Sequence, residues 1–258
     1  MKEKFTRIDI LAVMALVVLA LIAGCHSTSL MSETESSYNF FGASVRSLWM
    51  DAAAVRVLIS SNDSTYSDGS VRFSGDSLHY SNDAYWRFYY SADSISTGVN
   101  TVIFSDGVDF LDTVFTVVPG DVTDTVTGLP DNRVNPAGDV VTVDFTSAEN
   151  AEGYVLAVAL KDSLYTGFGF SQWISTQVTS ATIPREAFRV SGALDPDTGW
   201  YYVYIYAYTD SPDSTVTHSM LPMPLPGNLS DNIADERFKG RFGSLVVSAP
   251  DSVHVVVL

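Results

Sequence analysis

Few side chains in this sequence could act as nucleophiles, bases or metal ligands, and they are widely separated. There is one cysteine, Cys25, and the four histidines fall at positions 26, 79, 218 and 254. No two histidines have a metal-ligand spacing, and no His-Glu-x-x-His, Gly-x-Ser-x-Gly or phosphate-binding glycine motif occurs. A nucleophilic serine needs a nearby base, and no such pair can be nominated. We therefore predict that the protein is not an enzyme and has no metal or cofactor.

Acidic loops are the remaining candidates for ion binding. The stretches Asp195-Pro196-Asp197, Asn62-Asp63 and Asp68-Gly69 place carboxylates in expected turns, and Ca²⁺ takes oxygen ligands. None follows the Asp-x-Asp-x-Asp-Gly pattern with a glutamate at the twelfth position. Aspartate is also a common turn residue, so we interpret these loops as turns rather than calcium sites.

The N-terminus has three parts. Lys2, Lys4 and Arg7 precede an apolar run over residues 10–23, and a glycine then leads into Cys25. A basic head, a short apolar middle and a small-residue end are typical of an export signal. A permanent membrane helix is the alternative, but spanning a bilayer needs roughly 20 apolar residues and this run is shorter.

The sequence Ile22-Ala23-Gly24-Cys25 resembles the lipobox of bacterial lipoproteins. The resemblance implies that residues 1–24 are a signal peptide, that the bond before Cys25 is cut, and that Cys25 becomes the diacylated N-terminus. Acyl chains contribute about 0.8 kcal/mol per buried CH₂, so two or more hold a domain on a bilayer. His26 stands where enterobacterial lipoproteins kept in the inner membrane have aspartate. We therefore expect a lipid-anchored protein of the cell envelope, at the outer membrane.

Composition limits the partners. The formal net charge is −16, which repels nucleic acid and anionic lipid headgroups because binding phosphates depends on Lys and Arg. With Cys25 acylated no thiol remains for a disulfide, so each domain must depend on its apolar core. We expect membrane attachment through the lipid, a protein or polysaccharide partner, and no nucleic acid.

Beyond a polar tether at residues 25–37, the chain alternates apolar and polar residues with a period of two, which predicts strands. In residues 38–119, Val55, Val57 and Ile59 alternate with their neighbours, and Asp106-Gly107 supplies a tight turn between two strands near the end. Several short strands at such spacing predict an Ig-like β-sandwich. Pro119-Gly120-Asp121 is the predicted junction.

The second predicted domain, residues 122–258, resembles a fibronectin type III domain. Tyr201, Val203, Ile205 and Ala207 match the Tyr-x-Val-x-Val-x-Ala pattern of strand F in that family. The resemblance makes Tyr201 the tyrosine-corner residue. A long insertion over residues 210–239 precedes the closing strands. The predicted fold class is all-β, with two tandem β-sandwiches, Ig-like and then fibronectin type III-like.

Strict alternation along this strand leaves an aromatic ladder on its outer face: Trp200, Tyr202, Tyr204, Tyr206 and Tyr208. Two explanations compete. The insertion or the first domain packs over the ladder, because strands apolar on both faces are usually covered on both. Alternatively, the ladder is an exposed platform that stacks sugar rings or receives a partner.

The favoured function is a non-catalytic adhesion, scaffolding or ligand-presenting module on the bacterial envelope. The alternative is a polysaccharide-binding lipoprotein that uses the aromatic ladder. An envelope hydrolase is a third hypothesis, and it requires a carboxylate or histidine pair converging in one cleft, which the sequence does not indicate.

Overall fold

The structure is a computed structural model of the 258-residue chain. It describes residues 38–61, 64–107, 111–127, 133–135, 139–161, 170–188, 196–209, 233–234 and 237–256. Cys25, the signal peptide, the tether and residues 210–232 of the predicted insertion lie outside the described residues. Within the described ranges the regular elements are β-strands and two short 3-10 turns, η1 (Ala92–Ser94) and η4 (Arg185–Phe188).

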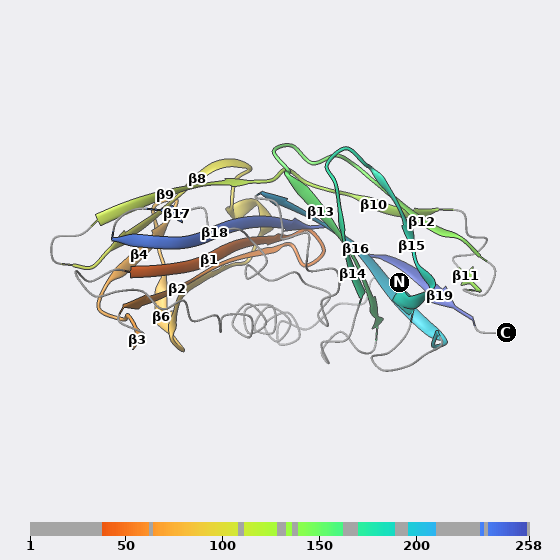
Figure 1. Ribbon diagram of the computed structural model, residues 1–258, viewed down its shortest axis with the longest axis horizontal. Coiled ribbons are helices and arrows are strands. Elements are labelled where there is room, and N and C mark those ends of the chain that lie inside the picture. The colour runs from red at the N-terminus through yellow and green to blue at the C-terminus, as the bar shows by residue number, and fades with distance from the viewer. Residues whose placement is uncertain are drawn as a thin grey trace.

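The first lobe is a sandwich of two sheets (Figure 1). One has the order β18 (Phe238–Val247), β1 (Tyr38–Ser47), β2 (Ala52–Ser61), β7 (Ala84–Tyr89), β6 (His79–Ser81). The other has the order β5 (Asp76–Ser77), β4 (Ser70–Phe73), β8 (Gly98–Ser105), β9 (Leu111–Val118). Two short strands, β3 (Ser64–Thr65) and β17 (Ile233–Ala234), pair with β2 and β18.

The alternation in the sequence explains how this lobe forms. Val55, Val57 and Ile59 are buried in its core, as their period of two predicts. The predicted hairpin is also confirmed: β8 and β9 pair antiparallel, and Gly107 has a φ of 81° in the connection. Glycine adopts that conformation without steric cost.

The second lobe is a smaller sandwich. One sheet consists of β10 (Asp124–Thr127), β12 (Val141–Phe145) and β15 (Ser180–Ile183). It faces β14 (Phe170–Ile174), β13 (Gly153–Leu160), β16 (Gly199–Thr209), β19 (Asp251–Val255) and β11 (Arg133–Val134). Strand β16 contains the residues that match strand F of the fibronectin type III pattern.

The tyrosine corner is present. The Tyr201 hydroxyl donates a hydrogen bond of 3.1 Å to the backbone carbonyl of Asp197, four residues upstream, and the Tyr201 side chain is buried. This bond fixes the chain where it enters β16. The fold is therefore all-β, with an Ig-like sandwich followed by a fibronectin type III-like sandwich.

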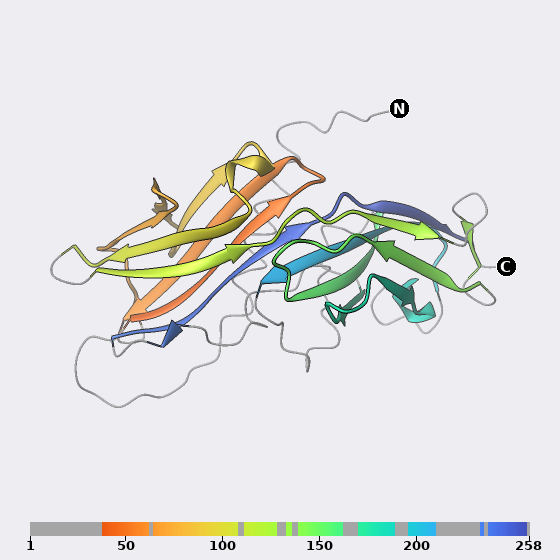
Figure 2. The ribbon, with the colours of Figure 1, turned by 90° about the horizontal axis from the view of Figure 1, so that it is seen from above.

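Strand β18 corrects the expectation that residues 240–247 close the sheet of the second domain. It pairs in parallel with β1 along its whole length, from Tyr38 beside Phe238 to Ser47 beside Val247. Only its last four residues also pair with β16. The chain then continues as β19 along the first half of β16. One 12-stranded sheet consequently runs through both lobes (Figure 2).

Candidate functional site

The aromatic ladder lies on the face of β16 that alternation predicts. Tyr201, Val203, Ile205 and Ala207 belong to the main core, whereas Tyr204, Tyr206 and Tyr208 belong to a second apolar cluster on the opposite face. That cluster also contains Val45, Val155, Ala157, Leu245 and Val247. The two faces of one strand therefore contribute to two separate cores.

Three of the five ladder residues are inaccessible. Tyr204, Tyr206 and Tyr208 are 4%, 3% and 2% exposed, and burial raises the pKa of Tyr206 and Tyr208 well above the ordinary value. This corrects the hypothesis of an exposed ligand-binding platform at these positions. The physical reason is burial of the aromatic surface, which is worth about 25 cal/mol per Å² removed from water.

Residues of the first lobe contribute to this burial. Trp49, in the turn between β1 and β2, lies 5.6 Å from Tyr202 and 5.9 Å from Tyr204 between ring centroids. Val45 of β1 belongs to the same cluster. Of the two coverings considered from the sequence, packing by the first domain is therefore found. The insertion itself lies outside the described residues.

The ladder remains accessible at its outer end. Trp200 is 48% exposed, and Tyr202 is half-buried. The Trp200 ring stacks on His254 of β19, with 4.8 Å between centroids and 22° between planes. Lys161, directly after β13, places its ammonium nitrogen 5.7 Å from the centre of the Tyr202 ring. This end of the sheet can stack a ring and supply cationic groups.

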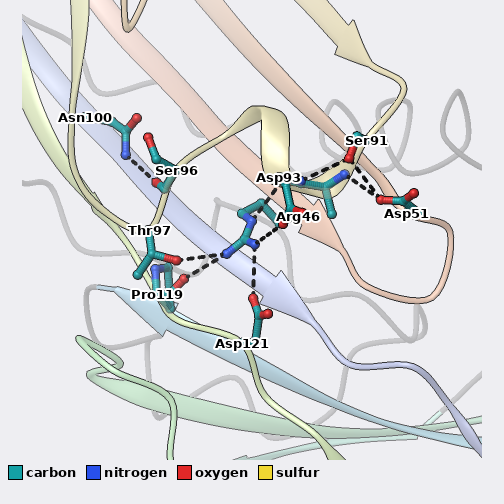
Figure 3. A network of polar contacts seen from close by, with 10 residues as sticks. Arg46, Asp51, Ser91, Asp93, Ser96, Thr97, Asn100, Pro119 and Asp121 are labelled. Atoms are coloured by element: carbon teal, nitrogen blue, oxygen red, sulfur yellow. Dashed lines mark hydrogen bonds and ion pairs between the residues drawn. The ribbon is translucent and has the colours of Figure 1, made fainter.

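A second polar site joins the lobes (Figure 3). The buried guanidinium of Arg46 donates to the carbonyls of Ala92 and Pro119, at 3.1 and 3.4 Å, and to the Thr97 hydroxyl at 3.2 Å. It forms an ion pair of 3.0 Å with Asp121. Pro119 and Asp121 lie in the predicted junction, so Arg46 fixes the connection between the two sandwiches to the end of β1.

Sequence analysis missed Arg46, because an arginine within an alternating strand has no signal that distinguishes a buried position from a solvent-facing one.

A second residue that the sequence did not single out is Asp124, at the start of β10. Neither carboxylate oxygen of Asp124 has a hydrogen bond of good geometry. Burial raises the pKa of Asp124 to about 7, the charge of Asp251 adds to the rise, and Ser248 opposes it.

Replacing Asp124 with asparagine should change how stability depends on pH. The native state holds a proton that the unfolded chain releases, with pKa values of about 7 and 3.8 respectively. The wild-type free energy of unfolding should therefore fall as pH rises from about 4 to about 7. The difference between the two pKa values corresponds to roughly 4 kcal/mol of stability lost by the wild type at high pH. Burying the amide of asparagine in the same place costs about 2 kcal/mol, which must be subtracted from that gain. Urea denaturation should show Asp124→Asn more stable by about 2 kcal/mol at pH 8.

The matched control is Asp144→Asn on β12, where the carboxylate is exposed and accepts a hydrogen bond from Thr127. That variant should keep the wild-type slope. Equal slopes for wild type and Asp124→Asn would contradict the assignment of a proton to Asp124.

The two histidines that the structure describes do not pair with each other. His79 is exposed on β6, and His254 is stacked on Trp200; His26 and His218 lie outside the described residues. Among the described residues, no three His, Cys, Asp or Glu side chains converge as a metal site would require. Asp68 and Asp197 are described, whereas Asn62, Asp63 and Asp195 are not.

Comparisons with known proteins add little. No family model matches the chain, and no curated protein matches it. A cryo-EM structure of native E. coli alpha-2-macroglobulin is similar over 71% of this chain and 14% of its own, with 9% identity and a TM-score of 0.24. The crystal structure of DIP-gamma IG1+IG2 is similar over 80% of this chain and 97% of its own, with 8% identity and a TM-score of 0.23. Such weak likenesses carry no argument about function.

No helix among the described residues has the length and apolar character needed to cross a membrane.

Proposed function

We propose that this protein is a non-catalytic, lipid-anchored module of the bacterial envelope, which presents its second sandwich as a ligand-binding or scaffolding element. Cys25, at the end of the lipobox-like sequence, is the proposed attachment point. The proposed location is the outer membrane, because position 26 is His26 and not the aspartate that keeps enterobacterial lipoproteins in the inner membrane.

The continuous sheet is the observation that carries this proposal. Strand β18 pairs with β1 of the first lobe and with β16 of the second, and Arg46 near the end of β1 binds the junction. Sheet pairing across the lobes opposes hinge motion between domains, and the hydrogen bond of the buried Arg46 guanidinium to Pro119 in the junction adds to this. Two sandwiches connected in this way act as one elongated body, suited to holding a surface at a distance.

The direction of the strands supports display of the second lobe. In Figure 1, β1 begins at the outer end of the first lobe and runs toward the second. The tether of residues 25–37 spans at most about 45 Å when extended. It joins the body at Tyr38, which begins β1. The outer end of the second lobe, where β16 begins, is therefore the part farthest from the anchor.

A polysaccharide-binding lipoprotein is the second candidate function. It is favoured by the exposed Trp200 and half-buried Tyr202 at that outer end, since aromatic rings stack well on flat ligands. Of the five ladder residues predicted to bind, only Trp200 and Tyr202 are accessible.

Membrane fractionation of a Cys25→Ser variant tests the anchor. The full-length wild type should sediment with membranes and enter the detergent phase, because two acyl chains give durable attachment. Cys25→Ser should raise the soluble fraction at least about tenfold and abolish labelling by radioactive palmitate. Ser29→Ala, in the same tether, should behave as wild type. A Cys25→Ser protein that still sediments wholly with membranes would refute the proposed anchor.

A further inference from the structure

Four side chains form a row across the outer end of the second lobe: Lys161, Trp200, His254 and Arg133. The register places Leu160 beside Tyr201, so Lys161 follows beside Trp200. Trp200 pairs with His254, and His254 pairs with Arg133 in the parallel ladder of β19 and β11. Residues paired across a sheet point to the same face. The next positions, Val134 and Val255, are fully buried, so His254 and Arg133 point outward.

The row concentrates cations in an acidic protein. The chain has 14 Lys and Arg residues against 30 Asp and Glu residues, yet this row contains a lysine, an arginine and a histidine. Lys161 and Arg133 are exposed. No ion pair joins either of them to an acidic side chain within the described ranges. Their charge is therefore available to an incoming anion.

Trp200 lies between Lys161 and His254 in the register of this row. One face of its ring stacks on His254, and the Trp200 side chain is still 48% exposed. The four strands are about 4.8 Å apart, so the row extends about 14 Å from Lys161 to Arg133. A row of that length suits a short oligomer that carries anionic groups along its length and stacks a central ring on Trp200. A single small ion would contact only one part of the row.

We propose that this row, the cationic–aromatic row, binds a carboxylate-bearing saccharide such as an acidic envelope polysaccharide. A pyranose ring stacks on the exposed surface of Trp200, with Tyr202 next along the same face of β16. The carboxylates pair with Lys161 and Arg133, and the guanidinium can bind a carboxylate through two parallel hydrogen bonds. This inference rests on the proposed display of the second lobe and names the ligand class for it.

Charge density separates this ligand from other polyanions. Duplex DNA carries one negative charge per about 1.7 Å, which a chain of net charge −16 repels. An acidic saccharide carries at most one carboxylate per sugar, and charges beyond about 8 Å are screened at physiological salt. The attraction of the saccharide to Lys161 and Arg133 is then stronger than its repulsion by the distant acidic residues. A flat anionic membrane would instead face the acidic surface of the whole molecule.

Isothermal titration of the full chain in detergent micelles tests the proposal, with tetragalacturonate as the anionic probe and maltotetraose as the neutral one. Tetragalacturonate should bind, and maltotetraose should bind at least about tenfold more weakly. Trp200→Ala should lower the association constant about tenfold, equivalent to roughly 1.4 kcal/mol. Lys161→Gln and Arg133→Gln should each lower it about threefold and reduce its dependence on salt.

Trp86→Ala is the matched control, because Trp86 is a partly exposed tryptophan on β7 of the first lobe. It should leave binding unchanged. Equal binding of both sugars, binding of neither, or an unchanged Trp200→Ala variant would overturn the proposal. Tighter binding to phosphatidylglycerol vesicles or to a single-stranded oligonucleotide would also overturn it. If binding fails while Cys25 still governs membrane attachment, only the ligand assignment fails and the proposed anchor stands.

Discussion

A Gly240→Ala variant should lose about 3–5 kcal/mol of stability, near the upper limit for a single substitution. Gly240 pairs with Phe40 at the start of the parallel ladder between β18 and β1. Its φ is 136°, and a Cβ at this position would clash with the carbonyl oxygen of Phe40. The contact is with backbone, so no side-chain rotation relieves it. Either β18 shifts away from β1 or the strand pairing is lost.

Gly75→Ala is the control for backbone conformation alone. Gly75 has a φ of 93°, but a Cβ there would have no atom within 4 Å. That variant should cost about 1–2 kcal/mol, the usual penalty for a non-glycine residue in the left-handed region. Chemical denaturation of both variants gives the comparison. Equal losses would show that β18 does not lie against β1 as described.

The Gly240→Ala variant also tests how strongly the folding of the two lobes is coupled. Strand β18 completes a sheet in the first lobe and continues into β19 of the second. Weakening it should therefore expose one lobe to unfolding before the other, so the transitions followed by different probes should separate.

Local alternation was sufficient to predict the strands and their faces. The period of two in β16 correctly separated Tyr201 and Val203 from Tyr204 and Tyr206, because a pleated strand allows no other arrangement. The tyrosine corner was implied by the resemblance of this strand to strand F of fibronectin type III domains, and the bond from Tyr201 to Asp197 confirms it. The hairpin of β8 and β9 was predictable because Gly107 marks its connection.

Long-range pairing was not predictable from alternation. The apolar pattern of residues 240–247 is compatible with any sheet edge, and nothing local indicates that its partner is β1, which is about 200 residues away. Trp49 was missed for the same reason: only the packing of the two lobes brings it to Tyr202 and Tyr204. The accessible part of the ladder therefore depends on tertiary structure, and sequence alone left both explanations open.

The burial of the ladder leads to the second large expected effect. Tyr204→Ala should destabilise the protein by about 3–5 kcal/mol, the usual cost of removing a buried aromatic side chain. Tyr204 is 4% exposed and contacts the rings of Trp49, Tyr202 and Tyr206. The substitution removes a contact between the lobes as well as core volume, so it should also make the two lobes unfold less cooperatively.

Tyr90→Ala is the matched control, because Tyr90 is 80% exposed although its ring contacts Phe88. It should change the free energy of unfolding by no more than about 0.5 kcal/mol. Urea denaturation followed by far-UV circular dichroism measures both variants. A loss below about 1 kcal/mol for Tyr204→Ala would mean that the middle of the ladder is open to solvent, and the platform of five aromatic residues would again be a candidate binding surface. A large loss restricts ligand stacking on this strand to its outer end, at Trp200 and Tyr202.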